Sequence, residues 1–237
     1  LAQFSRLKEH LLRATEQALG QRYLLDLVVP GGTRNDLAPA GAAGLDECIV
    51  QLTDEVTVLR GIYEEHTGLR DRFAGAGAVL PDLAAWLGLV GLAGRASGQA
   101  LDLRVDTACV PYDELAVRRC TQQDGDVLAR VTLRFDELAE SVRLLRRILR
   151  AMPSGEYAVA VPVPEPGAVG VGLIEAWRGP VVTGLEAGPD GSILRCHPQD
   201  PSWHNWPALE HAIVGNIVPD FPLINQSFNL SYSGHDL

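Results

Sequence analysis

Apolar residues recur every three or four positions along most of the chain before Pro153, which is the spacing of amphipathic helices. The pattern predicts helices over residues 1–19, 45–72 and 126–152. A shorter helix is expected after Pro81, because proline is favoured in the first turn of a helix. The helix at 126–152 has the clearest pattern, with charged residues opposite its apolar face. That apolar face consists of Val127, Val131, Phe135, Leu138, Val142, Leu145 and Leu149.

After Pro153 the pattern changes to short runs of Val, Leu and Ile divided by Gly and Pro, which is typical of strands. The sequence Gly-Pro-Asp-Gly at 188–191 indicates a tight hairpin turn between two of these runs. A last helix is expected over about 206–217, followed by an irregular tail. The predicted strands are residues 156–163, 169–176, 180–187 and 192–197.

Two glycine-rich segments earlier in the chain are predicted to be turns. Residues 23–32 are mainly apolar and end in Pro-Gly-Gly, where Gly32 is suited to a positive φ or to close backbone contact. Residues 94–98 read Gly-Arg-Ala-Ser-Gly and have little capacity to pack a core of their own. Helices followed by strands and a last helix predict the α+β class, a mainly helical bundle with a small antiparallel β subdomain at about 156–200.

The chain is expected to form one domain over residues 1–237. It begins at Leu1 without a methionine and already inside a helical pattern, so we expect it to be the C-terminal part of a longer chain. Apolar residues make up 46% of the sequence, which is enough to bury a sizeable core. No apolar run approaches the roughly 20 residues of a membrane span, so any peripheral membrane association is expected to go through partners.

The net charge of −10 argues against a nucleic-acid partner, because such a surface needs Lys and Arg clustered on one face. The acidic balance favours a docked protein partner instead. Basic residues cluster once, on the predicted helix at 126–152, where we expect them to form its solvated side. They are Arg143, Arg146, Arg147 and Arg150.

The four cysteines do not predict a disulfide framework, because no two of them form a Cys-x-x-Cys pair. We therefore expect reduced thiols and a cytoplasmic location. His204 and His211 are seven positions apart but have no cysteine or carboxylate partner at metal-ligand spacing. The cysteines are Cys48, Cys109, Cys120 and Cys196.

Six segments resemble, in order, parts of one known family. They are residues 20–32; residues 94–98 with Asp102, Arg104 and Tyr112; the helix with Arg130, Arg134, Glu137 and Ser141 that ends at Met152-Pro153; Glu175-Ala-Trp-Arg-Gly179; Arg195 with Pro201-Ser202 and Asn205; and Asp220, Ile224 and Ser227. The family is the large subunit of membrane-associated nickel–iron hydrogenases, together with its counterpart in complex I, the NADH-quinone oxidoreductase. No single motif is specific, but their order is.

The resemblance implies a chain that docks on an iron–sulfur small subunit and reaches membrane-arm subunits indirectly. In hydrogenases of this family, two Cys-x-x-Cys pairs hold nickel, and the second pair lies in the tail. Here Ser231 and Gly234 stand at those two positions. A serine hydroxyl is a poor ligand for a soft metal and glycine has no side chain, so this chain is expected to hold no metal. The resemblance places the iron–sulfur cluster in the partner subunit.

The complex I branch of the family also lost its nickel ligands and uses the emptied cavity for quinone, which makes quinone binding a hypothesis here. Thr183 stands where the family usually has a histidine, and threonine cannot relay protons near neutral pH as histidine does. The candidate residues facing the cavity or the partner's cluster are Arg95, Asp102, Arg104, Glu175, Arg178, Ser231, His235 and Asp236.

Two functions remain open from the sequence. The first is a subunit of a hydrogenase-like or NADH-quinone oxidoreductase-like redox complex. The second is a non-catalytic paralogue that keeps the fold and the docking surface and serves as a structural subunit or assembly factor.

Overall fold

The computed structural model describes residues 2–107 and 109–235. The chain divides into two compact units, each of which is built from two separate stretches of sequence. The first unit comprises the chain up to Tyr63 together with Ser141–Val163. The second comprises Glu64–Glu140 and the chain from Pro164 onward. The boundaries at Tyr63 and Ser141 fall inside long helices, so neither unit could be recognised from a linker in the sequence.

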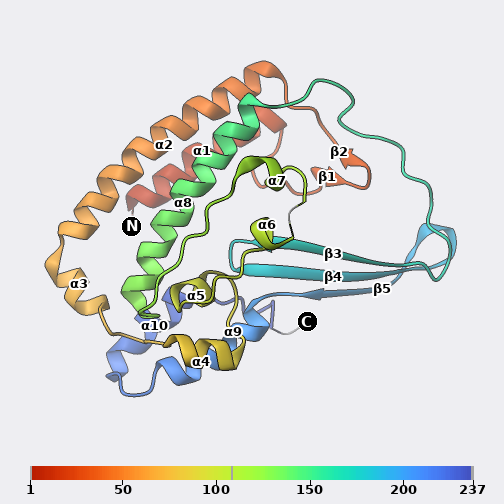
Figure 1. The fold of residues 1–237 in the computed structure, drawn as a ribbon. Helices are drawn as coiled ribbons and strands as arrows, with labels where there is room; N and C mark the ends of the chain where they lie inside the picture. The colour runs from red at the N-terminus through yellow and green to blue at the C-terminus, as the bar shows by residue number, and fades with distance from the viewer. Residues whose placement is uncertain (1, 108, 236–237) are drawn as a thin grey trace. The chain divides into compact units, whose positions relative to one another are not determined.

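The first unit contains α1 (Ala2–Leu19), most of α2 (Pro39–Glu65) and the last part of α8 (Val127–Arg150), as Figure 1 shows. A two-stranded hairpin of β1 (Val28–Val29) and β2 (Gly32–Thr33) connects α1 to α2. Ion pairs join the helices, one between Arg6 and Glu55 and one between Arg146 and Asp46 at 2.7 Å. The buried apolar side chains include Leu7, Leu27, Ile49 and Leu144.

Gly32 makes the close backbone contact that its sequence predicts. Its φ is +153°, and a Cβ at this position would lie 2.2 Å from the carbonyl oxygen of Tyr157. The backbone N–H of Thr33 donates to that same carbonyl at 3.0 Å. The Pro-Gly-Gly turn thereby holds the segment that follows α8.

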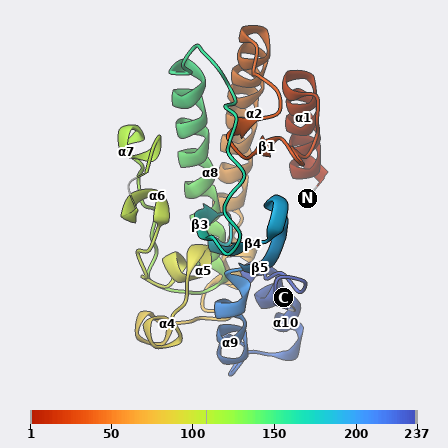
Figure 2. The same ribbon diagram turned by 90° about the vertical axis from the view of Figure 1, so that its right-hand side faces the viewer.

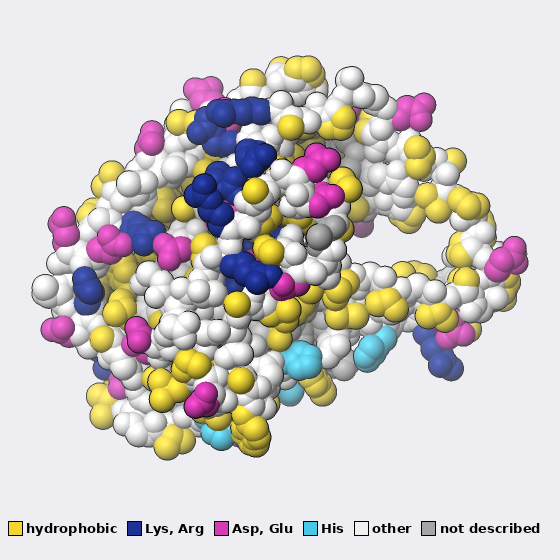
Figure 3. Space-filling view, in the orientation of Figure 1, with side chains coloured by type: hydrophobic (Ala, Val, Ile, Leu, Met, Phe, Trp, Pro, Cys, Tyr) yellow, Lys and Arg dark blue, Asp and Glu magenta, His cyan; other side chains and the backbone are white. Residues whose placement is uncertain are grey.

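The basic cluster on α8 is solvated only in part, because Arg143 and Arg146 are half-buried. Figure 3 shows Lys and Arg side chains gathered over the C-terminal part of this helix. Arg147 and Arg150 are exposed, whereas Arg146 is half-buried in its ion pair with Asp46.

The second unit combines short helices with one three-stranded sheet. Its helices are α3 (Thr67–Phe73), α4 (Pro81–Leu87), α5 (Gly91–Ala96), α6 (Leu103–Asp106), α7 (Tyr112–Leu115), the first part of α8, α9 (Ser202–Ala212) and α10 (Phe221–Phe228). The strands β3 (Val169–Ala176), β4 (Gly179–Ala187) and β5 (Ile193–Gln199) form an antiparallel sheet in that order. Short 3₁₀ turns lie at Pro189–Gly191 and Val218–Asp220.

The core of this unit is helical. Figure 2 shows α4, α9 and α10 grouped near α5, and their buried side chains form one cluster with the start of α8. Most of β3 and β5 is exposed, and the sheet becomes buried mainly near the β3–β4 turn, where Gly179 lies. The cluster consists of Ala76, Val79, Ala84, Leu89, Ala93, Val127, Ala208, Leu209, Ala212, Ile224 and Phe228.

Arg130 is fully buried in α8 and ties this helix to its neighbours. Its Nε donates to Ser227 Oγ at 2.8 Å, and its guanidinium lies 4.0 Å over the ring of Phe228. The other two nitrogens donate to the carbonyl oxygens of Gly125 and Gly77 at 2.6 and 3.0 Å. Burial lowers the pKa of Arg130 to about 9, so the side chain keeps its charge at neutral pH.

The α+β class is confirmed, and so are the strands at 169–176 and 180–187 and the hairpin turn after them. The predicted strand at 156–163 is wrong, because only Ala158 forms a β-bridge among the described residues of this segment. Pro162 cannot donate a backbone hydrogen bond, which limits pairing along this segment.

Three helix predictions need correction. The helix at 45–72 begins earlier, at Pro39, and breaks at His66, whose ring accepts from the N–H of Leu69 and caps α3. The glycine-rich stretch at 94–98 lies largely in α5, because burying all six residues of this helix outweighs the conformational cost of its glycines. The last predicted helix begins earlier, at Ser202, and the tail holds a further helix, α10.

The predicted apolar face of α8 is partly wrong as well. Leu145 is 46% exposed, whereas Arg130 and Glu140 are buried. Periodicity located this helix but did not show that charged side chains would form part of its buried face.

Gly125 provides a test of how tightly the second unit is packed. Its φ is +60°, and an added Cβ would lie 2.0 Å from the carbonyl oxygen of Val79. Gly75 has a similar φ of +72°, but an added Cβ there would meet none of the described atoms within 4 Å. We expect Gly75→Ala to lower the free energy of unfolding by about 1 kcal/mol through backbone strain alone. Gly125→Ala should lower it by about 1–3 kcal/mol more, as urea denaturation would show. Equal losses in the two variants would contradict this packing.

Candidate functional site

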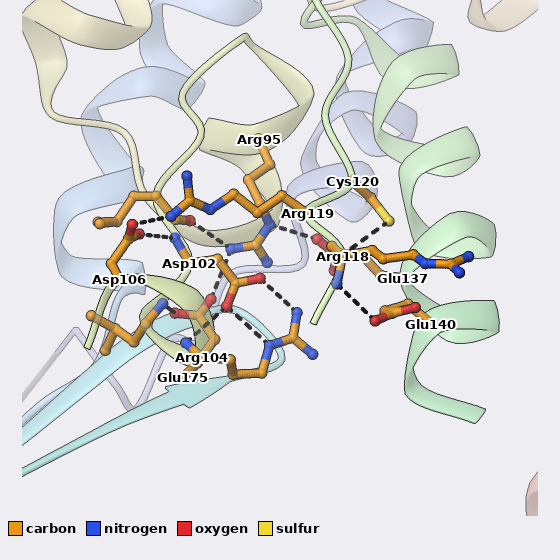
Figure 4. Close-up of polar contacts among 12 residues, drawn as sticks. Arg95, Asp102, Arg104, Asp106, Arg118, Arg119, Cys120, Glu137, Glu140 and Glu175 are labelled. Atoms are coloured by element: carbon orange, nitrogen blue, oxygen red, sulfur yellow. Dashed lines mark hydrogen bonds and ion pairs between the residues drawn. The ribbon is translucent and has the colours of Figure 1, made fainter. Parts of the chain in front are cut away.

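Five charged residues from four segments form the arginine–carboxylate cluster, which we define as Arg95, Asp102, Arg104, Glu137 and Glu175 (Figure 4). Arg95 lies in α5, and Asp102 is the N-cap of α6. Arg104 follows in α6, Glu137 lies in α8 and Glu175 lies near the end of β3. All five residues belong to the second unit.

Arg95 is the centre of the cluster and is only 2% exposed. Its Nε donates to Glu137 Oε1 at 2.6 Å. Its NH1 donates to Glu175 Oε1 at 2.8 Å and to the carbonyl oxygen of Leu101 at 3.0 Å. The planar guanidinium suits such a centre because it presents several donors in fixed directions. One side chain thus holds α8, β3 and the segment before α6.

Asp102 and Arg104 form a second, bidentate pair. The Nε of Arg104 donates to Asp102 Oδ1 at 3.0 Å, and its NH2 donates to Oδ2 at 2.7 Å. Asp102 also accepts from the backbone N–H of Arg104, which caps α6. Its own N–H donates to Asp106, which in turn pairs with Arg119.

The cluster contains two guanidiniums and three carboxylates, so burial and charge compensation compete within it. Burial raises the pKa of Glu175, and this effect exceeds the opposing effects of Arg95 and of the N–H of Leu103. For Asp102, burial is outweighed mainly by Arg104, so its pKa lies below the usual value. Burial would lower the pKa of Arg95, but Glu137 and Glu175 together raise it.

The β3–β4 turn connects the cluster to the tail of the chain. Glu175 and Arg178 lie near this turn, in which Ala176 pairs with Gly179. Arg178 lies 4.3 Å over the ring of Trp177, and its Nε donates to the carbonyl oxygen of Asn229 at 2.6 Å. The turn thus has Glu175 bonded to Arg95 on one side and Arg178 bonded to the tail on the other.

Two glycines allow the turn to approach α5. A Cβ on Gly91 would lie 1.9 Å from the carbonyl oxygen of Arg178, and a Cβ on Gly179 would lie 2.9 Å from the Cα of Gly91. Asn205 holds the residue before this contact, because its amide both accepts from and donates to the backbone of Val90.

Ser231 and Gly234, at which the resemblance to nickel–iron hydrogenases predicts thiolates, make other contacts in the tail. Ser231 Oγ accepts from the N–H of Gly234 at 3.0 Å, and the N–H of Ser231 donates to Ser202 Oγ at 2.9 Å. A Cβ on Gly234 would lie 2.6 Å from Asp200 Cγ. Within residues 2–107 and 109–235, no group of three or more His, Cys, Asp or Glu side chains could hold a metal ion.

The structure therefore divides the sequence-predicted site into two groups. Arg95, Asp102, Arg104 and Glu175 come together in the cluster. The second group, in or beside the tail, consists of Arg178, which bonds the tail backbone, Ser231, and His235, whose ring lies 4.9 Å from that of Trp203. Asp236 lies outside the described residues.

Sequence reasoning did not select Glu137, Asp106 or Arg119 as site residues. Glu137 belongs to one of the segments that carry the family resemblance, but nothing in its spacing predicts that it pairs with Arg95. Nothing in the spacing of Asp106 and Arg119 indicates that they pair. Their contact depends on the course of the chain between α6 and α8.

Residues 2–167 match the family described as the 49 kDa subunit of respiratory-chain NADH dehydrogenase. The chain belongs to this family. The resemblance to the large subunit shared by complex I and nickel–iron hydrogenases is thus confirmed, and the curated relatives of the chain include proteins of both kinds.

Two curated relatives illustrate this range. Formate hydrogenlyase subunit 5 of Escherichia coli is 29% identical, over 99% of this chain and 41% of that protein. A subunit of the NADH-quinone oxidoreductase of Salinibacter ruber is 26% identical, over 92% of this chain and 54% of that protein. The chain therefore spans only about half the length of these relatives.

A solved structure shares the fold closely. A chain of the membrane-bound sulfane sulfur reductase, an archaeal respiratory membrane complex, matches with a TM-score of 0.90 and 25% identity. The match covers 98% of this chain and 65% of that chain. Within the described part of the chain, no helix is long and apolar enough to cross a membrane.

Replacing Arg95 tests the cluster as a structural centre. We expect Arg95→Met to lower the free energy of unfolding by about 3–5 kcal/mol, because Glu175 and Glu137 then remain in the interior without their cation. The second change Glu175→Gln, made in the same protein, should recover part of this loss. Urea denaturation of the unaltered chain and both variants measures the effect. A loss below about 1 kcal/mol in Arg95→Met would contradict the assignment.

The lowered pKa of Asp102 predicts a specific dependence on pH. A carboxyl group whose pKa is lowered by folding stabilises the protein above its ordinary value of 3.8, and this contribution is lost as the pH falls through the lower, folded value. Asp102→Asn should therefore be less stable than the unaltered chain at neutral pH, by about 1–3 kcal/mol. It should also lose less stability below pH about 4.

The exposed Asp124 provides the matched control for this measurement. Asp124→Asn should follow the unaltered chain at every pH in chemical denaturation. If Asp102→Asn and Asp124→Asn show the same acid dependence, the ion pair with Arg104 does not stabilise the fold.

Proposed function

We propose that this chain is a subunit of a hydrogenase-like or NADH-quinone oxidoreductase-like redox complex, in which it docks on an iron–sulfur small subunit and holds no nickel itself. The observation that carries the proposal is the combination of a large-subunit fold with a closed tail. The fold matches a respiratory complex chain with a TM-score of 0.90. The tail, in contrast, has Ser231 and Gly234 where the resemblance to nickel–iron hydrogenases leads us to expect thiolates.

The contacts of the tail support the proposed absence of nickel in addition to the residue types found there. Ser231 uses its hydroxyl oxygen to accept from the N–H of Gly234, and the Asp200 side chain fills the space beside Gly234. A soft metal prefers thiolates, and the hard oxygen atoms present here are engaged in hydrogen bonds. In the proposed complex, the partner's iron–sulfur cluster would supply the electron transfer.

The part that this chain plays is one of positioning. Arg95 fixes the end of β3, and the contact between Gly91 and Gly179 fixes the turn that follows. Arg178 is therefore held against the tail by rigid elements instead of a loose loop. Rigid support of this kind is what a docking face for a redox partner requires.

A quinone is the proposed electron acceptor, and the name of the Salinibacter ruber relative, which belongs to an NADH-quinone oxidoreductase, supports this choice. Peripheral association with a membrane through partner subunits follows from the same proposal. The relatives named above are subunits of such complexes, and none of them is named as an assembly factor.

Affinity purification of the natural full-length protein from its own host tests the proposal. We expect an iron–sulfur protein to co-purify in a fixed ratio, with iron present and nickel well below one atom per chain by elemental analysis. The purified complex should reduce a water-soluble quinone. A tight complex without quinone-dependent turnover would favour the structural paralogue. One nickel atom per chain would overturn the proposed loss of metal.

A further inference from the structure

A pocket that lies outside the arginine–carboxylate cluster opens beside the tail of the second unit. It has a volume of about 620 Å³ and lies between α9, the start of α10 and the tail. We call it the aromatic pocket, because five of its lining side chains carry aromatic rings. The residues on which the argument depends are Trp203, Trp206, Glu210, Phe221, Tyr232 and His235.

The rings support one another and still leave much of their surface in water. The ring centroids of Trp203 and His235 are 4.9 Å apart, and those of Trp206 and Tyr232 are 5.2 Å apart. Trp203 nevertheless remains 49% exposed, Phe221 45% and Tyr232 67%. Exposed aromatic rings gathered at one pocket indicate a binding surface.

The charge of the pocket selects for a cation. Glu210 is exposed and lines the pocket, and among the described residues it forms no ion pair. No Lys or Arg side chain from the described part of the chain lines the pocket. Ring faces attract cations, and a guanidinium can both stack on a ring and donate two hydrogen bonds to one carboxylate.

This unit already stacks its own guanidiniums on rings in two places. Arg178 lies 4.3 Å over Trp177, and Arg130 lies 4.0 Å over Phe228. Both of these pairs are internal to the chain. The aromatic pocket also presents rings, with a carboxylate added, but without a Lys or Arg among the described residues of its lining.

We propose that the aromatic pocket receives an arginine side chain of a protein partner. The surroundings favour a protein over a small organic cation. The chain between Ile213 and Phe221, both of which line the pocket, exposes Val214, Ile217 and Val218 at 76%, 62% and 88%. Covering that apolar surface as well takes an interface of macromolecular size, and Trp, Tyr and Arg are the residues that dominate such interfaces. This inference about the pocket rests on the proposed function in one respect, which is that both require a protein partner.

Two short peptides test the chemistry directly on the unaltered chain. The probes are acetyl-Leu-Arg-Leu-amide and its citrulline counterpart, which has nearly the same shape but no charge. Titration followed by the indole N–H signals of the four tryptophans should shift those of Trp203 and Trp206 and leave that of Trp177 in place. We expect the citrulline peptide to bind about threefold or more weakly, because it lacks the cation.

Matched carboxylate variants identify the residue responsible. Glu210→Gln should weaken binding of the arginine peptide about threefold or more, whereas Glu165→Gln, at an exposed position of the same unit, should leave it unchanged. Trp203→Leu should weaken binding to a similar degree. Glu210 and Trp203 are both exposed, so circular dichroism should show unaltered folding in all three variants.

Several outcomes would overturn the proposal. They are equal binding of the two peptides, equal behaviour of Glu210→Gln and Glu165→Gln, and binding of tetramethylammonium without binding of the arginine peptide. Co-purification separates this proposal from the proposed function. If the iron–sulfur protein fails to co-purify even with the unaltered chain, the proposed function fails. If it co-purifies normally with both pocket variants, the pocket has no role in docking and the proposed function stands.

Discussion

The arrangement of the arginine–carboxylate cluster depends on one buried cation, the guanidinium of Arg95. Arg95 bonds to Glu137 and to Glu175, which lie 42 and 80 positions further along the chain. Removing three charges from water is costly, and such a group stabilises a fold only when every charge finds its partner. The cluster therefore couples the folding of α5, α8 and the end of β3. If one of these elements is out of place, a buried charge loses its partner and the folded state is destabilised.

Backbone contacts connect the cluster to the tail of the chain. The turn after Glu175 can approach α5 because Gly91 and Gly179 carry no side chains at their point of contact. From this turn Arg178 reaches the carbonyl oxygen of Asn229. A chain of short, directional contacts thus joins the buried cluster to the tail of the chain. The site is held by hydrogen bonds and close backbone approach more than by apolar area, since most of the sheet lies exposed.

Sequence reasoning succeeded where the deciding forces are local. The long helix ending before Pro153 and the strand at 169–176 follow from periodicity and breaking residues, and the structure has both. The four cluster residues named from the sequence came from the family resemblance, and the structure brings them together. Sequence reasoning failed where a segment far along the chain determines whether a side chain is buried. The burial of Arg130 depends on Ser227, 97 positions away, and no helical pattern could indicate it.

The contact between Asp200 and Gly234 limits which residues this part of the tail can accept. Any side chain at Gly234, a cysteine included, would meet the Asp200 carboxyl group, which also accepts from the N–H of Ser202 at 2.7 Å. Changing Asp200 first would remove that bond from the start of α9 and restore no ligand. No single substitution can therefore place a side chain at Gly234 without either a steric clash with Asp200 or the loss of that hydrogen bond. The two positions are coupled, so a side chain at Gly234 requires a compensating change at Asp200.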